Sequence, residues 1–180
     1  LPARRDPNAS MIIFLHGEDT YRSRQKLREL KEKFLREVDP SGANLAIIDG
    51  TTAEASEIWG AIAAQSFLVR KRLVIIEDIG QQKSKIAREE IAAFLDRVPE
   101  DVIVVFWESK SRAPSSETKV RSTKKGRSKK SNDTDAGKGD PLFTHLLGEK
   151  YAQAFAPLGG AELGAWMRQR ATELGTTIAP

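Results

Sequence analysis

The stretch Gln65–Ile79 reads QSFLVRKRLVIIEDI and decides how the rest of the chain is interpreted. Its second half contains the apolar run Leu73-Val74-Ile75-Ile76, which two acids follow. A continuous run of aliphatic and β-branched residues is typical of a strand buried on both faces of a parallel sheet. We therefore predict a central strand over residues 72–77.

The first half of this stretch places two large apolar residues, Phe67 and Leu68, between Ser66 and the basic residues 70–72. A connection from a helix to a strand is ordinarily polar, so exposed apolar residues there need a physical reason. One interpretation is that they fold back and cover the edge of the sheet. The other is that they contact a partner protein. The residues themselves leave both interpretations open.

Apolar runs alternate with amphipathic stretches on both sides of this segment. Strands are predicted over residues 11–15, 44–48, 72–77, 101–107 and 151–155, and helices over residues 21–38, 53–64, 84–98, 141–147 and 161–174. In the helix over residues 84–98, the side chains expected to face inward are Ile86, Ile91, Phe94 and Leu95. The helix over residues 161–174 is predicted to be amphipathic, with apolar residues at helical spacing: Leu163, Trp166, Met167 and Ala171. Strands that alternate with helices indicate an α/β fold with a parallel sheet and right-handed crossovers.

The composition excludes several classes of protein. The 180 residues contain no cysteine, which excludes disulfides, thiolate zinc sites and a cysteine nucleophile. No apolar run approaches the roughly 20 residues that a membrane helix needs, and no signal peptide is recognisable. We expect a soluble, cytoplasmic protein without a membrane partner.

The formal charge of +4 is unevenly distributed. Between Ser109 and Ser131 lie nine of the 29 bases and one of the 25 acids, so the remainder is mildly acidic. The basic and polar segment 109–140 has no apolar periodicity and is predicted to be disordered. Its candidate contacts to nucleic-acid phosphates are Lys124, Lys125, Arg127, Lys129 and Lys130. The alternative is a solvated linker, and the lack of an aromatic residue within it excludes base stacking there.

The turn after the first strand stands where a nucleotide triphosphatase carries its phosphate loop, GxxxxGK[ST]. After Gly17 the chain reads Glu18-Asp19-Thr20, with carboxylates where phosphates would lie and no lysine in the required place. We therefore predict no ATPase site, no cofactor, no metal and no catalytic residue. His16 and His145 are too isolated to indicate a catalytic triad.

Acidic residues follow several of the predicted strands, namely Glu18, Asp19, Asp49, Glu77, Asp78 and Glu108. Such acids could hold magnesium beside a phosphorylated aspartate, as in a receiver domain, with Lys110 as the nearby cation. Acids at these positions also cap the helices that follow and remain solvated, which is the simpler interpretation.

Four segments together resemble the delta subunit of the bacterial DNA polymerase III clamp loader. They are IIFLHGEDTYRSRQKLRELKEKF (12–34), AAQSFLVRKRLVIIEDI (63–79), VIVVFWE (102–108) and YAQAFAPLGGAELGAWMRQRATELGTTI (151–178). The resemblance implies a RecA-like, AAA+-type domain over residues 11–158, without a functional phosphate loop. It also implies the start of a small helical domain over residues 159–180. Residues 1–10 are interpreted as a leader or an expression remnant.

The same resemblance implies a non-catalytic subunit of the DNA polymerase holoenzyme, a nucleotidyltransferase assembly. Such subunits bind the sliding clamp, the beta subunit, and help to open it for loading onto DNA during replication. The implied partners are the clamp, the other loader subunits and primed DNA. The family's clamp-contacting pair is Leu-Phe, and Ser66-Phe67-Leu68 matches its position with the order reversed. The alternatives are a receiver-like phosphoacceptor and a general nucleic-acid-binding module.

Overall fold

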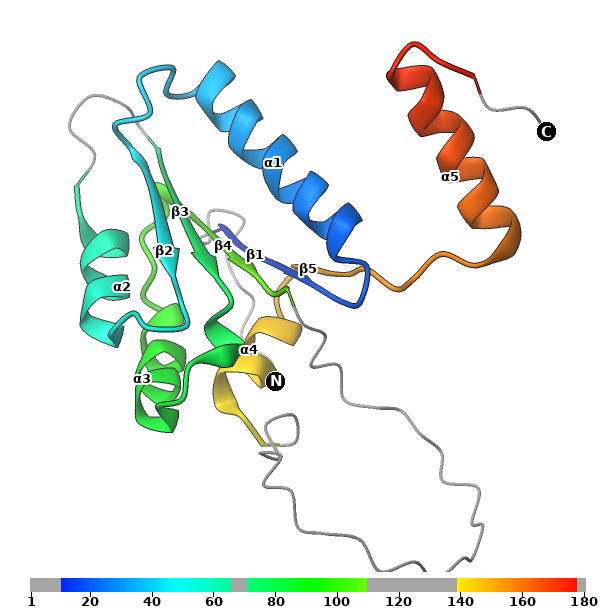
Figure 1. Cartoon of the computed structure of the whole chain (residues 1–180). Coiled ribbons are helices and arrows are strands. Elements are labelled where there is room, and N and C mark those ends of the chain that lie inside the picture. Colours follow the sequence, from blue (N-terminus) through cyan, green and yellow to red (C-terminus); the bar gives the residue numbers. More distant parts are fainter. Residues whose placement is uncertain (1–10, 66–70, 110–138, 178–180) are drawn as a thin grey trace, which may run out of the picture.

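The computed structural model describes residues 11–65, 71–109 and 139–177. Its strands form one parallel sheet in the order β2-β3-β4-β1-β5, shown in Figure 1. The strands are β1 (Met11–His16), β2 (Leu45–Asp49), β3 (Arg72–Glu77), β4 (Val102–Trp107) and β5 (Tyr151–Ala154). The helices are α1 (Thr20–Glu37), α2 (Ala55–Ala63), the 3-10 helix η1 (Ile79–Gln81), α3 (Lys85–Leu95), α4 (Pro141–Leu147) and α5 (Gly160–Glu173). The predicted α/β fold with a parallel sheet is confirmed.

The central position of β3 explains its continuous apolar run. Leu73 and Ile75 belong to the core cluster on one face of the sheet, and Val74 and Ile76 belong to the cluster on the other. All four side chains are at most 2% exposed. Successive side chains of a strand point to opposite faces, so a strand between two helical layers needs apolar residues at every position.

The two helical layers are unequal (Figure 1). Helix α1 packs on one face of the sheet through Leu27 and Phe34, whereas α2, α3 and α4 cover the other face. Ile47, on the edge strand β2, is 52% exposed. The face that carries α1 is therefore the more open one.

The prediction that Ile86 faces inward is wrong, because its side chain is 68% exposed. Ser84 caps α3 by accepting a hydrogen bond from the N–H of Ala87 at 3.2 Å, so Ile86 stands in the first turn. The buried side chains of α3 begin one position later and are Ala87, Arg88, Ile91, Phe94 and Leu95.

The predicted disordered segment 109–140 lies largely outside the described residues, but both of its ends are held. The N–H of Ser109 donates to Asp78 Oδ1 at 2.6 Å. Asp140 is buried, and its carboxylate accepts from Leu142 N at 3.0 Å and from Arg88 Nε at 2.7 Å. The predicted boundaries are thus wrong at these two residues, because Asp140 caps α4.

Helix α5 has little of the inner face that its sequence predicts. Leu163 and Met167 are 41% and 43% exposed, and Ala171 is buried. The ring of Trp166 meets that of Tyr21 on α1 edge to face, with 5.6 Å between ring centroids. Of the apolar residues at helical spacing in α5, only Ala171 is buried within the described part of the chain. None of the helices in the described ranges is long and apolar enough to span a membrane.

Candidate functional site

The turn between β1 and α1 is closed by the chain that follows β5. The N–H of Phe155 donates to the carbonyl of His16 at 2.7 Å, and the N–H of Asp19 donates to the carbonyl of Phe155 at 3.0 Å. Gly17 has a φ of +131°, and a Cβ atom there would lie 2.3 Å from the Phe155 carbonyl oxygen. Only glycine allows the two backbone segments to come this close. The role of Gly17 here is therefore to let the chain after β5 pack against the turn.

The amino terminus of α1 is also occupied by its own side chains. Asp19 accepts hydrogen bonds from Arg22 N at 2.9 Å and from Arg22 Nε at 2.7 Å. Burial raises the pKa of Asp19, but the hydrogen bonds and charge of Arg22 outweigh it and hold the pKa below its usual value. Of the two residues that could cap this helix from the sequence, Thr20 and Asp19, the structure has Asp19 as the cap. A phosphate bound at this helix end would need the amide groups of the first turn. One of them, that of Arg22, already donates to the Asp19 carboxylate.

Two acids at the carboxyl edge of the sheet tie β3 to β4. Glu108 is 2% exposed and accepts a hydrogen bond from Gly80 N at 2.8 Å. Asp78 adopts a left-handed conformation with φ +59° and accepts from the N–H of Ser109. The expectation that such acids stay solvated is wrong for Glu108, because the amide group of Gly80 in η1 lies inside the protein and needs an acceptor.

Little supports the receiver-like alternative. Lys110 lies outside the described residues, and the Glu108 carboxylate is committed to Gly80. Within residues 11–65, 71–109 and 139–177, no three His, Cys, Asp or Glu side chains are placed to hold a metal ion together. The histidines have local roles: His16 stacks on Phe14, with 4.6 Å between ring centroids, and His145 Nε2 lies 3.0 Å from Glu149 Oε1.

The candidate clamp contact, Ser66, Phe67 and Leu68, lies outside the described residues. So do the candidate nucleic-acid contacts Lys124, Lys125, Arg127, Lys129 and Lys130. The flanking elements are defined, because α2 ends at Ala63 and β3 begins at Arg72. Residues 66–70 therefore join the amino end of β3, at the sheet edge opposite the turn after β1.

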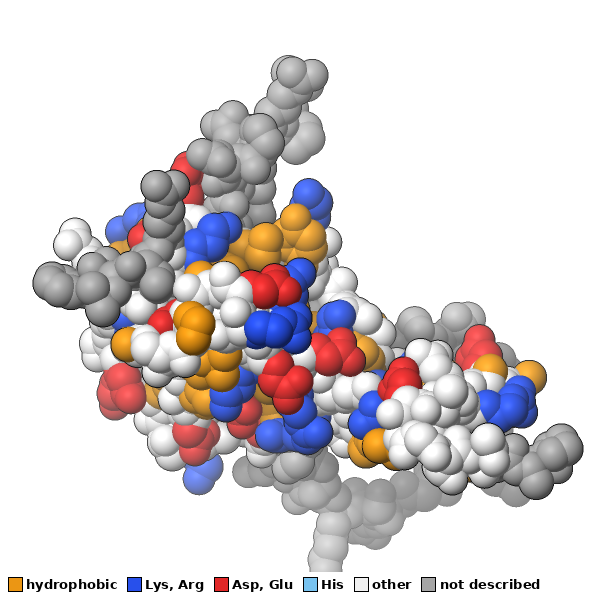
Figure 2. Space-filling view, turned by 90° about the horizontal axis from the view of Figure 1, so that it is seen from above, with side chains coloured by type: hydrophobic (Ala, Val, Ile, Leu, Met, Phe, Trp, Pro, Cys, Tyr) orange, Lys and Arg blue, Asp and Glu red, His pale blue; other side chains and the backbone are white. Residues whose placement is uncertain are grey.

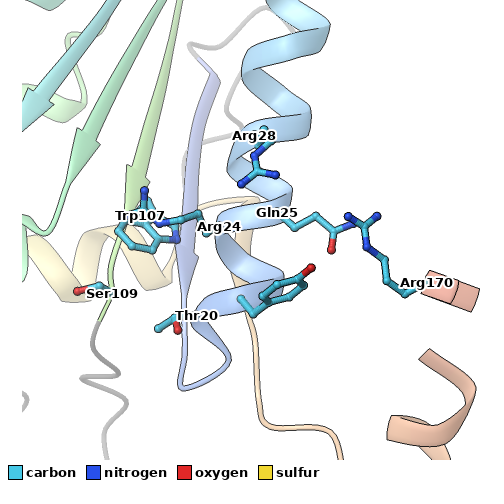
Figure 3. A pocket seen from close by; sticks show the side chains of 8 residues that line it. Thr20, Arg24, Gln25, Arg28, Trp107, Ser109 and Arg170 are labelled. Atoms are coloured by element: carbon cyan, nitrogen blue, oxygen red, sulfur yellow. The ribbon is translucent and has the colours of Figure 1, made fainter. Parts of the chain in front are cut away.

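Sequence reasoning did not identify an arginine-lined groove of about 470 Å³ between α1, the end of β4 and α5 (Figure 3). Its lining residues are Thr20, Tyr21, Arg24, Gln25, Arg28, Trp107, Ser109 and Arg170. Arg24 and Arg28 share a helix face at a spacing of four residues, which the sequence does show. Arg170 comes from the far end of the chain, and no local pattern connects it to α1.

Two of these arginines are held in place. The guanidinium of Arg24 lies 4.0 Å from the centre of the Trp107 ring, and Trp107 Nε1 donates to Ser23 Oγ at 3.1 Å. Arg170 donates to Glu173 at 2.7 Å. Hydrogen bonds to Glu173 and to the Tyr21 side chain raise the pKa of Arg170. Two of the three arginines that line the groove are thus held by neighbouring side chains.

No family model and no curated protein sequence matches the chain. Its structure is similar to that of the DNA clamp loader delta protein of Bacillus subtilis, with a TM-score of 0.57 and 15% identity, over 95% of this chain and 45% of that one. A DNA polymerase III gamma subunit-related protein of Thermotoga maritima gives a TM-score of 0.48 and 15% identity, over 92% and 47%. The chain thus spans less than half the length of either protein. The Bacillus comparison shows that the chain has the fold of this part of a clamp loader delta protein, a parallel five-stranded sheet flanked by helices.

Proposed function

We propose that the chain is part of a non-catalytic clamp-loader subunit that binds the sliding clamp and helps to open it for loading onto DNA. The observation that carries the proposal is a clamp-loader delta fold in which the turn after β1 is closed by Phe155 and capped by Asp19. Phosphate-loop enzymes use this turn to hold the β- and γ-phosphates of the nucleotide. A domain of this fold without that site acts through binding.

The proposed contact to the clamp is Phe67 and Leu68, with Ser66 beside them. The support is their position ahead of β3, where the resembling family carries its clamp-contacting pair. Helix α2, which precedes them, packs through Ile58 and Ile62, both 0% exposed. The apolar stripe of α2 is thus supplied by residues of the helix itself. The further proposed partners are the other loader subunits and primed DNA, and the proposed location is the cytoplasm.

The test is the double substitution F67A/L68A. A few apolar anchors usually dominate an interface, so we expect binding to the clamp of the same organism to weaken by about 2–4 kcal/mol, or about 30- to 1000-fold. Surface anchors contribute little to folding, so urea unfolding of the free chain should stay nearly unchanged. Clamp affinity by surface plasmon resonance and unfolding by circular dichroism are measured on the same preparation.

The matched control is I86A/L174A, which removes two large apolar side chains that are each 68% exposed and belong to α3 and to the end of α5. This control should bind the clamp like the unaltered chain. Unchanged clamp affinity in F67A/L68A together with a loss of several kcal/mol in unfolding free energy would show that the pair plugs the sheet edge instead. Equal weakening in the two double variants would also contradict the proposed contact.

A further inference from the structure

Helix α1 carries a row of bases, Arg24, Arg28 and Lys31, along one side. Their spacing of four and three residues places them on the same helix face. Arg24 and Arg28 line the groove toward α5, where Arg170 joins them. Both also line, with Lys31, a second groove of about 160 Å³ between α1 and the strands β2 and β3. The two grooves share two arginines, so these four bases form one continuous surface, called the α1 basic surface below.

The bases of α1 differ in how far the protein's own acids neutralise them. Four of them lie within 4 Å of a carboxylate on α1 or its cap, in the pairs Arg22–Asp19, Lys26–Glu29, Lys33–Glu37 and Arg36–Glu37. Within the described part of the chain, Arg28 and Lys31 have no acid at ion-pair distance. Arg24 is 3.7 Å from Glu77. The α1 basic surface therefore has uncompensated charge at its centre.

Figure 2 views the molecule from above, on the side where Figure 1 shows α1, and basic and acidic side chains are interspersed there. Attraction of an anion to this face therefore depends on which bases lack a partner, rather than on a uniformly positive surface. Glu77 lines the second groove beside Arg24, Arg28 and Lys31 and pairs with Arg24. Glu32 follows Arg28 by four residues on the same helix, and Glu173 pairs with Arg170.

The fixed side chains of the groove suit phosphate. Arginine forks match phosphate oxygens in a bidentate manner, and Arg24 is already oriented by the Trp107 ring. The groove also presents the hydroxyl-bearing residues Thr20 and Ser109 and the amide of Gln25 (Figure 3). Neutral donors of this kind contact phosphate and sugar oxygens in nucleic-acid complexes.

The dimensions favour a strand of nucleic acid over a single small anion. At a rise of about 1.5 Å per residue, Arg24 and Lys31 are separated by about 10 Å along the helix. A duplex strand presents one phosphate about every 3.4 Å of axis, so this length faces about three phosphates. Tyr21 lies at the amino end of the row and is 58% exposed, which offers a ring for a base to stack on.

We propose that the α1 basic surface binds the phosphate backbone of nucleic acid without sequence preference, with Arg28 and Lys31 as its main phosphate contacts. The surface shares no residue with the connection that carries Phe67 and Leu68. The proposal does not depend on clamp binding and is tested without the clamp.

The test compares two double variants of the whole chain by fluorescence anisotropy with a labelled 20-nucleotide oligodeoxythymidine. R28Q/K31Q should raise the dissociation constant about tenfold. Each lost phosphate contact lowers the slope of log K against log salt by about 0.7 for a single strand, so the slope should become shallower by about 1.4. Arg28 is exposed, Lys31 is half-buried, and neither is paired with an acid in the described part of the chain, so thermal melting by circular dichroism should show a nearly unchanged midpoint.

The control K26Q/K33Q removes the same charge from the same helix, but from bases that pair with Glu29 and Glu37. It should change affinity less than about twofold. The lysines of residues 110–138 are present in both variants, so the difference between them isolates the α1 basic surface.

Three results would overturn the proposal. Equal weakening in the two variants would mean that net charge alone governs binding. Polyglutamate that binds as tightly as the oligonucleotide, with the same loss in R28Q/K31Q, would assign the surface to an acidic protein segment. Binding too weak to detect for the unaltered chain at 50 mM salt would remove the site altogether.

Discussion

Asp39 is a buried carboxylate that organises the connection between α1 and β2. It accepts hydrogen bonds from the hydroxyl of Ser41 and from the N–H of Asn44, the latter at 2.7 Å. The Ser41 hydroxyl, followed by the Asn44 amide, stabilises the charged form and lowers the pKa of Asp39 below its ordinary value of 3.8. The ionised form of Asp39 thus stabilises the connection between α1 and β2.

The lowered pKa gives a pH dependence of known sign. A carboxyl group whose pKa is depressed by folding contributes stability above its unfolded pKa, and this stability is lost as the pH falls through the folded value. We expect D39N to be less stable than the unaltered chain at pH 7, with a gap that closes below about pH 4. Urea midpoints measured at pH 7, 5 and 3 check this, and a gap of constant size would contradict it.

The sequence predicts side-chain roles well where both partners are close in the chain. Asp19 was predictable as a cap because its partner, the N–H of Arg22, is three residues away. Glu108 was not, because its partner Gly80 lies 28 residues earlier and meets it only when β3 and β4 pair. The same limit hides Arg170, which reaches the groove along α1 only in the folded chain.

At the scale of elements, the Arg88–Asp140 pair joins α3 to the start of α4. The two atoms of the ion pair, Arg88 Nε and Asp140 Oδ2, are 2.7 Å apart, and the side chains are 11% and 6% exposed. Arg88 also donates to the carbonyl of Gln82. We expect R88M to lower the free energy of unfolding by about 3–5 kcal/mol, because it leaves the Asp140 carboxylate buried without its cation.

Urea unfolding followed by circular dichroism measures this loss. The control is K85M on the same helix, where Lys85 is 72% exposed and pairs with Glu89 at 3.4 Å, so the cost should be below about 1 kcal/mol. The double variant R88M/D140L should cost less than the two single substitutions together, because neither charge is then left alone. A cost below about 1 kcal/mol for R88M would show that the pair adds no net stability.

Elements with sharp boundary signals were predicted to the residue. Strand β3 begins within a run of bases and ends at two acids, and α4 begins with Pro141 at its first position and ends before Gly148. Helix α5 was located, but its environment was not, because apolar periodicity identifies a face without identifying what covers it. Its exposed Leu163 and Met167 mark this limit.

At the scale of the whole molecule, the alternation of strands and helices predicts a parallel sheet but leaves the strand order open. Each βα unit can add to either side of the strand before it, and every strand reads as an apolar run. No strand order was predicted; in the structure it is β2-β3-β4-β1-β5, and the predicted parallel sheet is confirmed.

The closed turn after β1 predicts that the whole chain does not bind ATP. Titration calorimetry with magnesium-ATP should show no heat of binding, because the Asp19 carboxylate accepts from the amide that a phosphate would use and no lysine stands at the phosphate-loop position after Gly17. A phosphate-loop ATPase titrated in the same buffer serves as the positive control. A dissociation constant in the micromolar range would contradict the prediction.

The place of β5 beside β1 also sets when the sheet can be completed on the ribosome. β1 is synthesised before the other strands of the sheet. Its edge that pairs with β5 stays unpaired until the residues after Trp107 have been translated. Roughly 40 residues separate β4 from β5, and at about 5 to 20 residues per second their translation takes about 2 to 8 s. During those seconds β1 is a nascent edge strand with open hydrogen-bonding groups, the kind of edge to which another chain can add. The long basic segment thus lengthens the time during which the nascent chain has an unpaired β1 edge and can pair with another chain.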